Sequence, residues 1–157
     1  MMPLLYVETS ILSYLAARRS RDIIRAARQQ ITRQWWQTRR ASFTAVTSGI
    51  VLEEASAGDS SVARRRLDRA KGIRELEITE EAIVLAEDLM VEGPLPRKAA
   101  VDALHISIAT VHKVEYLLTW NCKHIANAAM RNKIEAVCRS RGYTAPIMCT
   151  PEELMEG

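Results

Sequence analysis

Four polar residues occupy positions where a folded chain could do chemistry: Glu8, Glu54, Asp102 and Asn121. Glu8 ends the apolar run at 4–7, and Asn121 follows the apolar segment 114–120. Short apolar runs of this kind are typical of buried strands. Because open parallel sheets bind their ligands beyond the carboxyl ends of the strands, we take Glu8 and Asn121 as the first candidates for a site.

Asp102 lies within the nearly apolar segment 99–109. A buried carboxylate without a partner is costly, so Asp102 would need a partner or a metal ion unless it caps its helix or faces solvent. We expect this helix to run from Arg97 to Lys113, which would place Asp102 beyond the first turn. Glu54 follows an apolar run as well, although most glutamates on helices are surface residues.

Glu8 and Asn121 also have simpler interpretations, since Glu8 could contact the start of the next helix and Asn121 could be an N-cap. Taken together, the four candidates supply the oxygen ligands that hard divalent cations prefer. A cation held there would orient water and stabilise charge on a phosphate under attack. Without a cation the carboxylates would repel a phosphate backbone. We therefore expect a metal ion if the substrate is a nucleic acid.

The elements that must position these residues alternate along the chain. We expect strands at 3–8, 42–46, 74–78, 114–120 and 146–149. We expect helices at 11–17, 20–40, 48–55, 60–71, 80–91, 97–113 and 121–141, with a brief helix after a capping box at 150–153. This alternation predicts an α/β fold with a parallel sheet covered on both faces.

Composition indicates an ordinary globular protein. The chain has 157 residues, 48% of them hydrophobic, and shows no repeat or linker, so we expect one domain over residues 1–157. Six glycines and five prolines exclude collagen-like and low-complexity classes. No apolar run is long enough for a membrane span, and the N-terminus lacks the basic region of a signal peptide. We expect a cytoplasmic protein without a membrane partner.

Cysteine usage agrees with a reducing compartment. The chain has three cysteines, an odd number, and no CxxC motif, which argues against a disulfide framework or a structural zinc site. A thiol hydrolase or zinc site built from Cys122, His105 and His124 is disfavoured, because neither a ligand spacing nor an oxyanion hole is recognisable. No phosphate-binding glycine motif occurs either.

Charge is unevenly distributed although the net charge is only +3. Residues 18–40 hold eight arginines and one aspartate, residues 74–92 hold seven acids and one arginine, and a second basic cluster lies at 64–71. This pattern predicts a face for a polyanion, or else solvated helix faces. Trp35 and Trp36 lie in the first basic segment, where we favour packing over stacking on RNA bases.

The order of the motifs resembles a known family. The chain contains Glu8-Thr9-Ser10, then Ser48 followed six residues later by Glu54, then the segment 102–106 (DALHI), then 117–121 (LLTWN). Over about residues 4–149 this resembles the PIN-domain superfamily, in particular the VapC-like toxins of bacterial toxin–antitoxin modules. The resemblance implies a three-layer α/β/α domain with a short parallel sheet of strand order 3-2-1-4-5.

The resemblance also implies a function. It suggests a metal-dependent endoribonuclease that uses Mg²⁺ or Mn²⁺, is inhibited by a cognate antitoxin protein and commonly forms a homodimer. Glu8, Glu54 and Asp102 match the family's first, second and third acids, and Asn121 matches the position of a fourth aspartate. Under this interpretation the basic segment 18–40 could bind either RNA or an acidic antitoxin tail.

Other residues beside the site follow from the same resemblance. Thr9 and Ser10 match the small hydroxyl residues that follow the first acid, and they are candidate substrate contacts. His124 lies beside the site in a variant branch of these proteins and could contact phosphate, or it could be a surface residue.

Two departures from the family pattern stand out. Glu8 reaches about 1.5 Å farther than an aspartate would, and Asn121 lacks a charge, which should weaken a second metal ion more than the first. These departures motivate the alternative of a catalytically impaired PIN-like module that binds RNA or protein.

Overall fold

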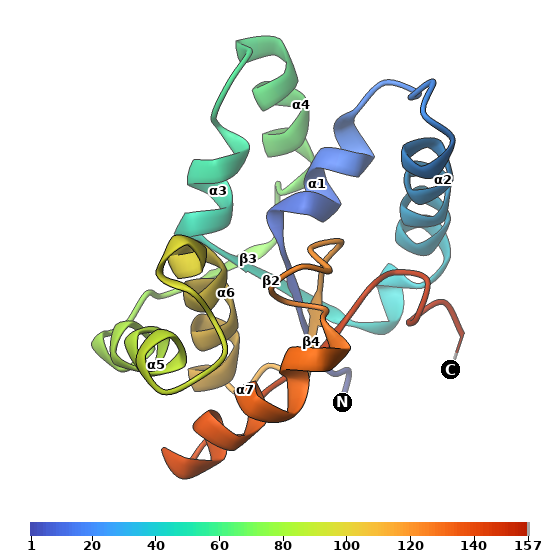
Figure 1. Cartoon of the computed structure of the whole chain (residues 1–157). Coiled ribbons are helices and arrows are strands. Elements are labelled where there is room, and N and C mark those ends of the chain that lie inside the picture. Colours follow the sequence, from blue (N-terminus) through green and yellow to red (C-terminus); the bar gives the residue numbers. More distant parts are fainter. Residues whose placement is uncertain (157) are drawn as a thin grey trace.

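The computed structural model describes residues 1–156, and within them five parallel strands form one sheet of order β3-β2-β1-β4-β5 (Figure 1). The strands are β1 (Leu4–Val7), β2 (Thr44–Ser48), β3 (Arg74–Leu76), β4 (Tyr116–Leu118) and β5 (Ile147–Cys149). Tyr6 of β1 is in register with Val46 of β2 and Leu117 of β4. The predicted parallel sheet and its strand order are confirmed.

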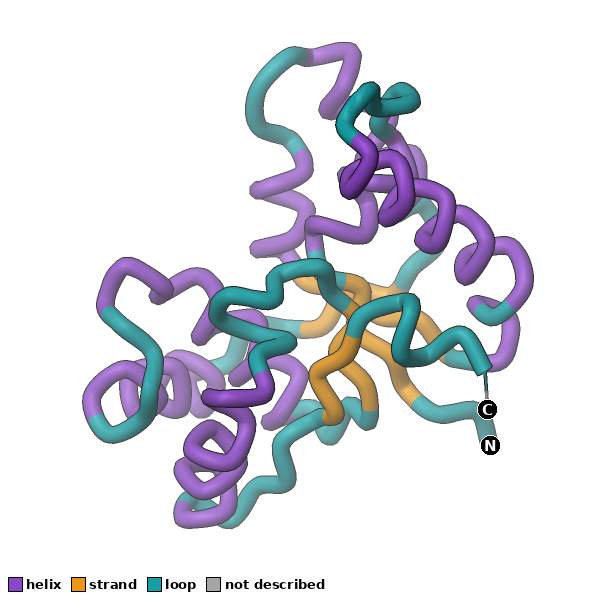
Figure 2. Tube along the Cα trace, turned by 45° about the vertical axis from the view of Figure 1, so that its right-hand side comes forward, coloured by secondary structure: helices purple, strands orange, loops and turns teal. Residues whose placement is uncertain are grey.

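Helices flank the sheet in two groups. They are α1 (Thr9–Ala16), α2 (Ile23–Thr38), α3 (Gly49–Ala55), α4 (Ser60–Arg69), α5 (Glu80–Val91), α6 (Ala100–Val111) and α7 (Ala128–Ser140), with 3₁₀ turns η1 (Arg40–Ser42) and η2 (Arg97–Ala99). Helix α1 packs against α2, α3 and α4, whereas α5 packs against α6 and α7. Figure 2 shows the strands between these two groups. No helix within residues 1–156 is long and apolar enough to cross a bilayer.

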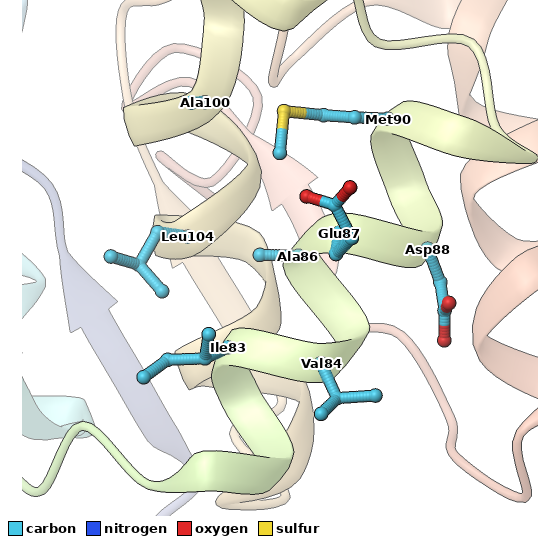
Figure 3. Close-up of a pocket in the computed structure, with 8 residues that line it drawn as sticks. All are labelled: Ile83, Val84, Ala86, Glu87, Asp88, Met90, Ala100 and Leu104. Atoms are coloured by element: carbon cyan, nitrogen blue, oxygen red, sulfur yellow. The ribbon is translucent and has the colours of Figure 1, made fainter.

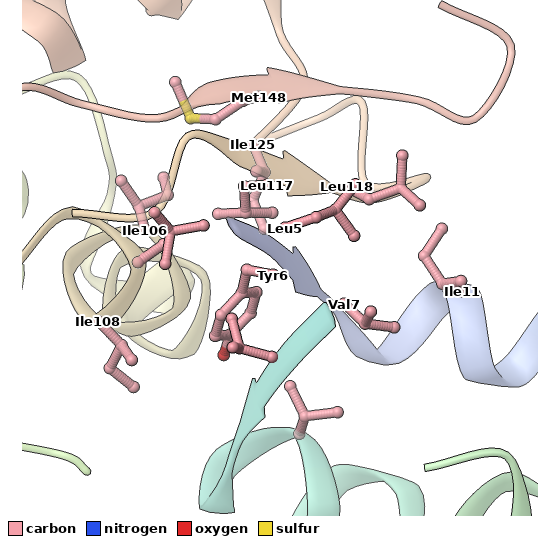
Figure 4. Close-up of a cluster of buried hydrophobic side chains, with 14 of the residues drawn as sticks. Leu5, Tyr6, Val7, Ile11, Ile106, Ile108, Leu117, Leu118, Ile125 and Met148 are labelled. Carbon is pink, nitrogen blue, oxygen red and sulfur yellow. The ribbon is translucent and has the colours of Figure 1, made fainter. Parts of the chain in front are cut away.

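The central strand β1 forms the middle of the core. Leu5, Tyr6 and Val7 are fully buried, as expected for a parallel strand with helices on both faces. Figure 4 shows their side chains beside Leu117 of β4 and Ile106 of α6. Burying an aliphatic side chain of this size stabilises the fold by about 1.5–3 kcal/mol. The core therefore fixes the end of β1, where Glu8 begins the next segment.

Two predicted helix boundaries are wrong at the candidate site. Helix α6 begins at Ala100, after the η2 turn, so Asp102 lies in its first turn and not beyond it. Pro96 is extended, with φ −75° and ψ 160°, and the three residues after it form the 3₁₀ turn, so the α-helix starts three residues later than predicted. The Asn127 side chain caps α7, which begins at Ala128. Residues 121–127, where we expected the start of this helix, form irregular turns.

Side-chain caps define where several helices begin. The Glu8 side chain caps α1 by accepting from Ser10 N, which confirms that Glu8 contacts the start of the next helix. Asp22 caps α2, which is therefore shorter than the predicted helix at 20–40. The capping box is confirmed, since Thr150 N and Glu153 N each donate to the other residue's side chain. The residues that follow form turns and not a helix.

Candidate metal centre

The carboxyl ends of β1 and β4 place Glu8 beside Thr119. Val7 is in register with Leu118, and Glu8 N donates to Leu118 O at 3.2 Å, which continues the ladder by one residue. Glu8 is 5% exposed. Its Oε1 accepts three hydrogen bonds, from Ser10 N at 3.0 Å, from Ser10 Oγ and from Thr119 Oγ1 at 2.6 Å. Donors of this kind compensate a buried carboxylate for the loss of water.

Glu54 extends from α3 toward the same edge of the sheet. Its Oε1 accepts from Thr9 Oγ1 at 2.5 Å and from His105 Nε2 at 2.7 Å, while the side chain stays 37% exposed. Partial burial acts to raise the pKa of Glu54, but the hydrogen bonds from His105 and Thr9 outweigh it and lower the pKa below its usual range. Glu54 is therefore ionised at neutral pH.

His105 connects Glu54 to the core. The imidazole is fully buried, and its Nδ1 lies 2.7 Å from the Tyr6 hydroxyl, which in turn lies 2.7 Å from Ser48 Oγ. Burial raises the pKa of Tyr6 far above its usual range, so the hydroxyl keeps its proton. Ser48 Oγ also accepts from Val51 N at the start of α3. Four elements thus meet behind Glu54.

These contacts bring two of the three predicted acids, Glu8 and Glu54, together with His105. One ligand atom each from Glu8, Glu54 and His105 lie within 4.8 Å of one another. In each of the two glutamates, the structure shows all hydrogen bonds on Oε1, and Oε2 receives none from residues 1–156. Two adjacent carboxylates with one free oxygen each fit a hard divalent cation, which would offset their repulsion.

Asp102 lies on α6, one turn before His105 on the same helix face. Its Oδ2 is 2.9 Å from His124 Nδ1, and the carboxyl is 22% exposed. The carboxylate is therefore half-buried, and His124 is the partner that the sequence predicts for a carboxylate in an apolar helix. Its Oδ1 receives no hydrogen bond from the described part of the chain.

Asn121 acts as a cap on the turn that follows β4. Its Oδ1 accepts from His124 N at 3.0 Å, and its N–H donates to Thr119 Oγ1 at 2.9 Å. Thr119 in turn donates to Glu8. Asn121, His124 and Asp102 are thus connected to Glu8 through a continuous set of hydrogen bonds, although Asp102 and His124 are not part of the three-residue group around Glu54.

The sequence matches the family model of the PIN domain over residues 5–129. The chain belongs to the PIN-domain family. A chain in the crystal structure of VapBC2 from Rickettsia felis bound to a DNA fragment from their promoter has the same fold. Its TM-score is 0.58 at 15% identity, over 94% of this chain and 98% of that one. None of the curated proteins matches the sequence. The resemblance inferred from the motifs is therefore confirmed at the level of family and fold.

His105 and Thr119 are the residues of this PIN domain that sequence reasoning missed. His105 had been considered only for a thiol or zinc site, and Thr119 only as part of a strand. The spacing could have indicated that His105 lies near the site, because it follows Asp102 by three residues and so shares its helix face. Nothing local indicated that Thr119 faces Glu8, since that contact depends on the pairing of β1 with β4.

Several arginines of the PIN domain make contacts within the fold. Arg33 donates to Ala17 O at 2.7 Å and Arg65 Nε to Ala16 O at 3.1 Å, so both secure the end of α1. Arg28 lies with its guanidinium 5.0 Å from the centre of the Trp120 ring. The basic segments are therefore partly structural and are not only a solvated surface.

The tryptophan predictions can be compared directly with the structure. Trp35 is fully buried, and its Nε1 donates to Leu154 O at 3.0 Å, so its packing role is confirmed. Trp36 is half-buried beneath the guanidinium of Arg40, 4.7 Å from the ring centre.

A separate hollow lies between α5 and α6. Ile83, Val84 and Met90 of α5 and Leu104 of α6 line it (Figure 3). The carboxylates of Glu87 and Asp88 lie at its margin. None of the candidate metal ligands contributes to this hollow, so its apolar lining is distinct from the acidic edge of the sheet.

Proposed function

We propose that this PIN domain is a metal-dependent endoribonuclease and the toxin of a toxin–antitoxin pair. The observation that carries the proposal is the convergence of Glu8 and Glu54 within 4.8 Å, at the carboxyl edge of a parallel sheet. Protein donors fix one oxygen of each carboxylate, and the other oxygen is left without a donor from residues 1–156. Such a pair is suited to hold Mg²⁺ or Mn²⁺.

Glu8, Glu54, Asp102 and Asn121 are the proposed metal and catalytic residues. Asp102 approaches from α6 with Oδ1 free, and Asn121 offers an amide at the end of β4. A cation held by these residues would supply an activated water molecule and would stabilise charge on the phosphodiester. Hydrogen bonds orient the two glutamates. Ser10 and Thr119 donate to Glu8, and Thr9 donates to Glu54.

Substrate binding is proposed to involve Thr9, Ser10 and His124 together with the basic segments. Asp102 holds His124 through Nδ1, which leaves Nε2 without a partner among the described side chains. Exposed arginines at 18–40 and 64–69 can neutralise a phosphate backbone. A ribonuclease of this kind needs acidic residues that bind the metal ion and basic residues around them that bind the RNA backbone.

The proposed partners are an RNA substrate, a cognate antitoxin protein and a second copy of the chain. The similar crystal structure is described as VapBC2 bound to promoter DNA, which supports a protein partner for this chain. We further propose that residues 1–157 act as one domain in the cytoplasm.

The alternative is a catalytically impaired PIN-like module that binds RNA or protein. Two observations favour it. Glu8 and Asn121 stand where the family commonly has aspartates, and Asn121 already uses its Oδ1 to cap a turn. An amide engaged in this way contributes less to a cation than a free carboxylate would.

One experiment separates the two functions. Purified protein free of antitoxin is incubated with defined RNAs and Mn²⁺, with and without EDTA, beside Asp102→Ala. Cleavage by the wild type that is lost in Asp102→Ala and in EDTA supports the nuclease. Equal cleavage by both proteins indicates a contaminating enzyme, and RNA binding without cleavage favours the binding module.

A matched pair of variants sharpens the test. Glu53 and Glu54 are adjacent on α3, but the Glu54 side chain accepts from His105 and Thr9, whereas the Glu53 side chain has no hydrogen-bond partner within residues 1–156. Glu54→Gln should lose most cleavage, and Glu53→Gln should retain it. Equal loss in both variants would contradict the proposed centre.

A further inference from the structure

A fully buried row of polar side chains lies behind Glu54, and no part of the proposed cleavage reaction uses it. The row runs from Ser48 through Tyr6 to His105, and all three are 0% exposed. We propose that this row positions Glu54 for metal binding, with His105 acting as a positioning residue and not as a metal ligand. The inference rests on the proposed function, since it deepens the role of Glu54.

The hydrogen bonds of the row have one consistent direction. Glu54 Oε1 accepts from Thr9 Oγ1 and, as a carboxylate oxygen, also accepts from His105 Nε2–H. His105 Nδ1 then accepts from the Tyr6 hydroxyl, and Tyr6 accepts from the Ser48 hydroxyl. Ser48 Oγ accepts from Val51 N. Every buried donor in the row thus has an acceptor.

Metal ligation by His105 would disturb this arrangement. Nε2 would have to give up its proton and its bond to Glu54, and Nδ1–H would then donate to Tyr6. Tyr6 would donate to Ser48, which already accepts from Val51. The Ser48 hydroxyl proton would then have no acceptor among the described residues, although it is fully buried, and an unpaired buried donor is costly. The row therefore favours an imidazole that accepts at Nδ1 and donates to Glu54 through Nε2–H.

The position of Glu54 explains why such support is needed. It lies one residue before the end of α3, a helix of only seven residues, and its side chain is 37% exposed. A long side chain there loses rotamer freedom when it is held in one orientation. The row connects Glu54 to β1, β2 and α6, which are anchored in the core and therefore hold its side chain in one orientation. Oε1 is thereby directed to His105 and Thr9, and Oε2 is left for the cation.

Mn²⁺ binding without RNA tests the proposal independently of cleavage. Free Mn²⁺ is measured by electron paramagnetic resonance for the wild type and for His105→Leu, His105→Gln and Tyr6→Phe. Loss of a residue that orients a ligand typically weakens metal affinity about 10–100-fold. We expect a loss of that order for His105→Leu and a smaller loss for Tyr6→Phe. His105→Gln should recover part of the affinity, because its amide N–H can still donate to Glu54.

Tyr116→Phe is the matched control. Tyr116 begins β4, at the opposite end of that strand from Thr119, and its ring packs edge-on against Phe43. This variant should bind Mn²⁺ like the wild type. Urea unfolding of each variant shows whether the fold is intact, and the nearly isosteric Tyr6→Phe variant decides the test if His105→Leu does not fold.

Pulsed electron paramagnetic resonance distinguishes positioning from ligation. A ¹⁴N coupling to bound Mn²⁺ in the wild type that disappears in His105→Gln would mean direct ligation and would overturn the proposal. Wild-type affinity in all three row variants would also overturn it while leaving the proposed metal site intact. Failure of the wild type to bind Mn²⁺ would instead remove the proposed function and this inference with it.

Discussion

Thr119 and Glu8 are 111 positions apart in sequence, yet the Thr119 hydroxyl donates to Glu8 Oε1 at 2.6 Å. The same hydroxyl accepts from Asn121 N at 2.9 Å. The contact with Glu8 follows from the pairing of β1 with β4, which ends at Val7 and Leu118, whereas the contact with Asn121 is local to the turn after β4. One buried hydroxyl therefore links the first acid of the site to the residue that follows the fourth strand.

Thr119→Val should lower Mn²⁺ affinity and also destabilise the fold. Valine keeps the shape of threonine but leaves the Asn121 N–H without its acceptor and removes a donor from Glu8, at a cost of about 1–3 kcal/mol. Thr110→Val is a suitable control, because the buried Thr110 hydroxyl donates to Ile106 O in its own helix and its side-chain partner is Cys138, so it makes no contact with Glu8 or Asn121. Urea unfolding and Mn²⁺ titration are compared. Equal Mn²⁺ affinity in the two variants would count against the role of Thr119.

Glu8→Asp should reduce cleavage although aspartate is common at this position in the family. The shorter side chain withdraws the carboxylate by about 1.5 Å, away from Thr119 Oγ1 and from the other ligand atoms. A displacement of about 1 Å can reduce a rate on the order of a hundredfold. Initial cleavage rates at saturating Mn²⁺ measure the effect. An aspartate variant as fast as the wild type would show that the length of Glu8 is not matched to this site.

Asn121→Asp should strengthen metal binding. Aspartate keeps the acceptor that caps His124 N and adds a charge beside Glu8 and Asp102. We expect Mn²⁺ affinity to rise several-fold, most clearly for a second ion, with little change in folding stability. Calorimetric titration gives both affinity and stoichiometry. Unchanged Mn²⁺ affinity in this variant would show that Asn121 is remote from the metal.

Asp59 should contribute a pH-dependent part of stability outside the site. It caps α4, and hydrogen bonds from Ser61 and Val62 lower its pKa. A depressed folded pKa stabilises the fold above the unfolded value of about 3.9, and this contribution is lost as pH falls through the folded pKa. Asp59→Ser keeps a capping oxygen without the charge. The difference in unfolding free energy between the two proteins should shrink below about pH 3.9, and a constant difference would contradict this assignment.

Thiol labelling should distinguish one cysteine from the other two. Cys122 is exposed, whereas Cys138 and Cys149 are buried. Burial, assisted by Glu153, raises the pKa of Cys149 to about 12, and burial also raises the pKa of Cys138. The thiolate is the form that reacts with an alkylating reagent. Cys138 and Cys149 stay protonated at pH 8, so we expect them to be labelled slowly. Mass spectrometry after brief alkylation should show one label per folded chain, and three labels in urea.

The local patterns of the sequence predicted much of this architecture. The buried strand before Glu8 and the capping box at Thr150 depend on residues close together in the chain, so periodicity and capping rules identify them. The family resemblance supplied the strand order, which the structure confirms. The roles of Glu8, Glu54, Asp102 and Asn121 stay predictions, although the structure shows where each side chain lies.

Local sequence rules did not predict the surroundings of Asp102 and Asn121. Asp102 was expected to be buried past the first turn, but a 3₁₀ turn after Pro96 shifts the start of α6. Asn121 was expected to begin a helix, but Asn127 provides the cap and α7 starts seven residues later. In both cases two nearby start signals compete, and tertiary packing decides between them.

The sequence by itself determined which residue types stand at the ends of strands and in what order they follow one another. Only the tertiary structure decided that Glu54 meets His105 and that Glu8 meets Thr119. The physical reason is that these hydrogen bonds join segments brought together by parallel crossovers, where distance along the chain says nothing about distance in space.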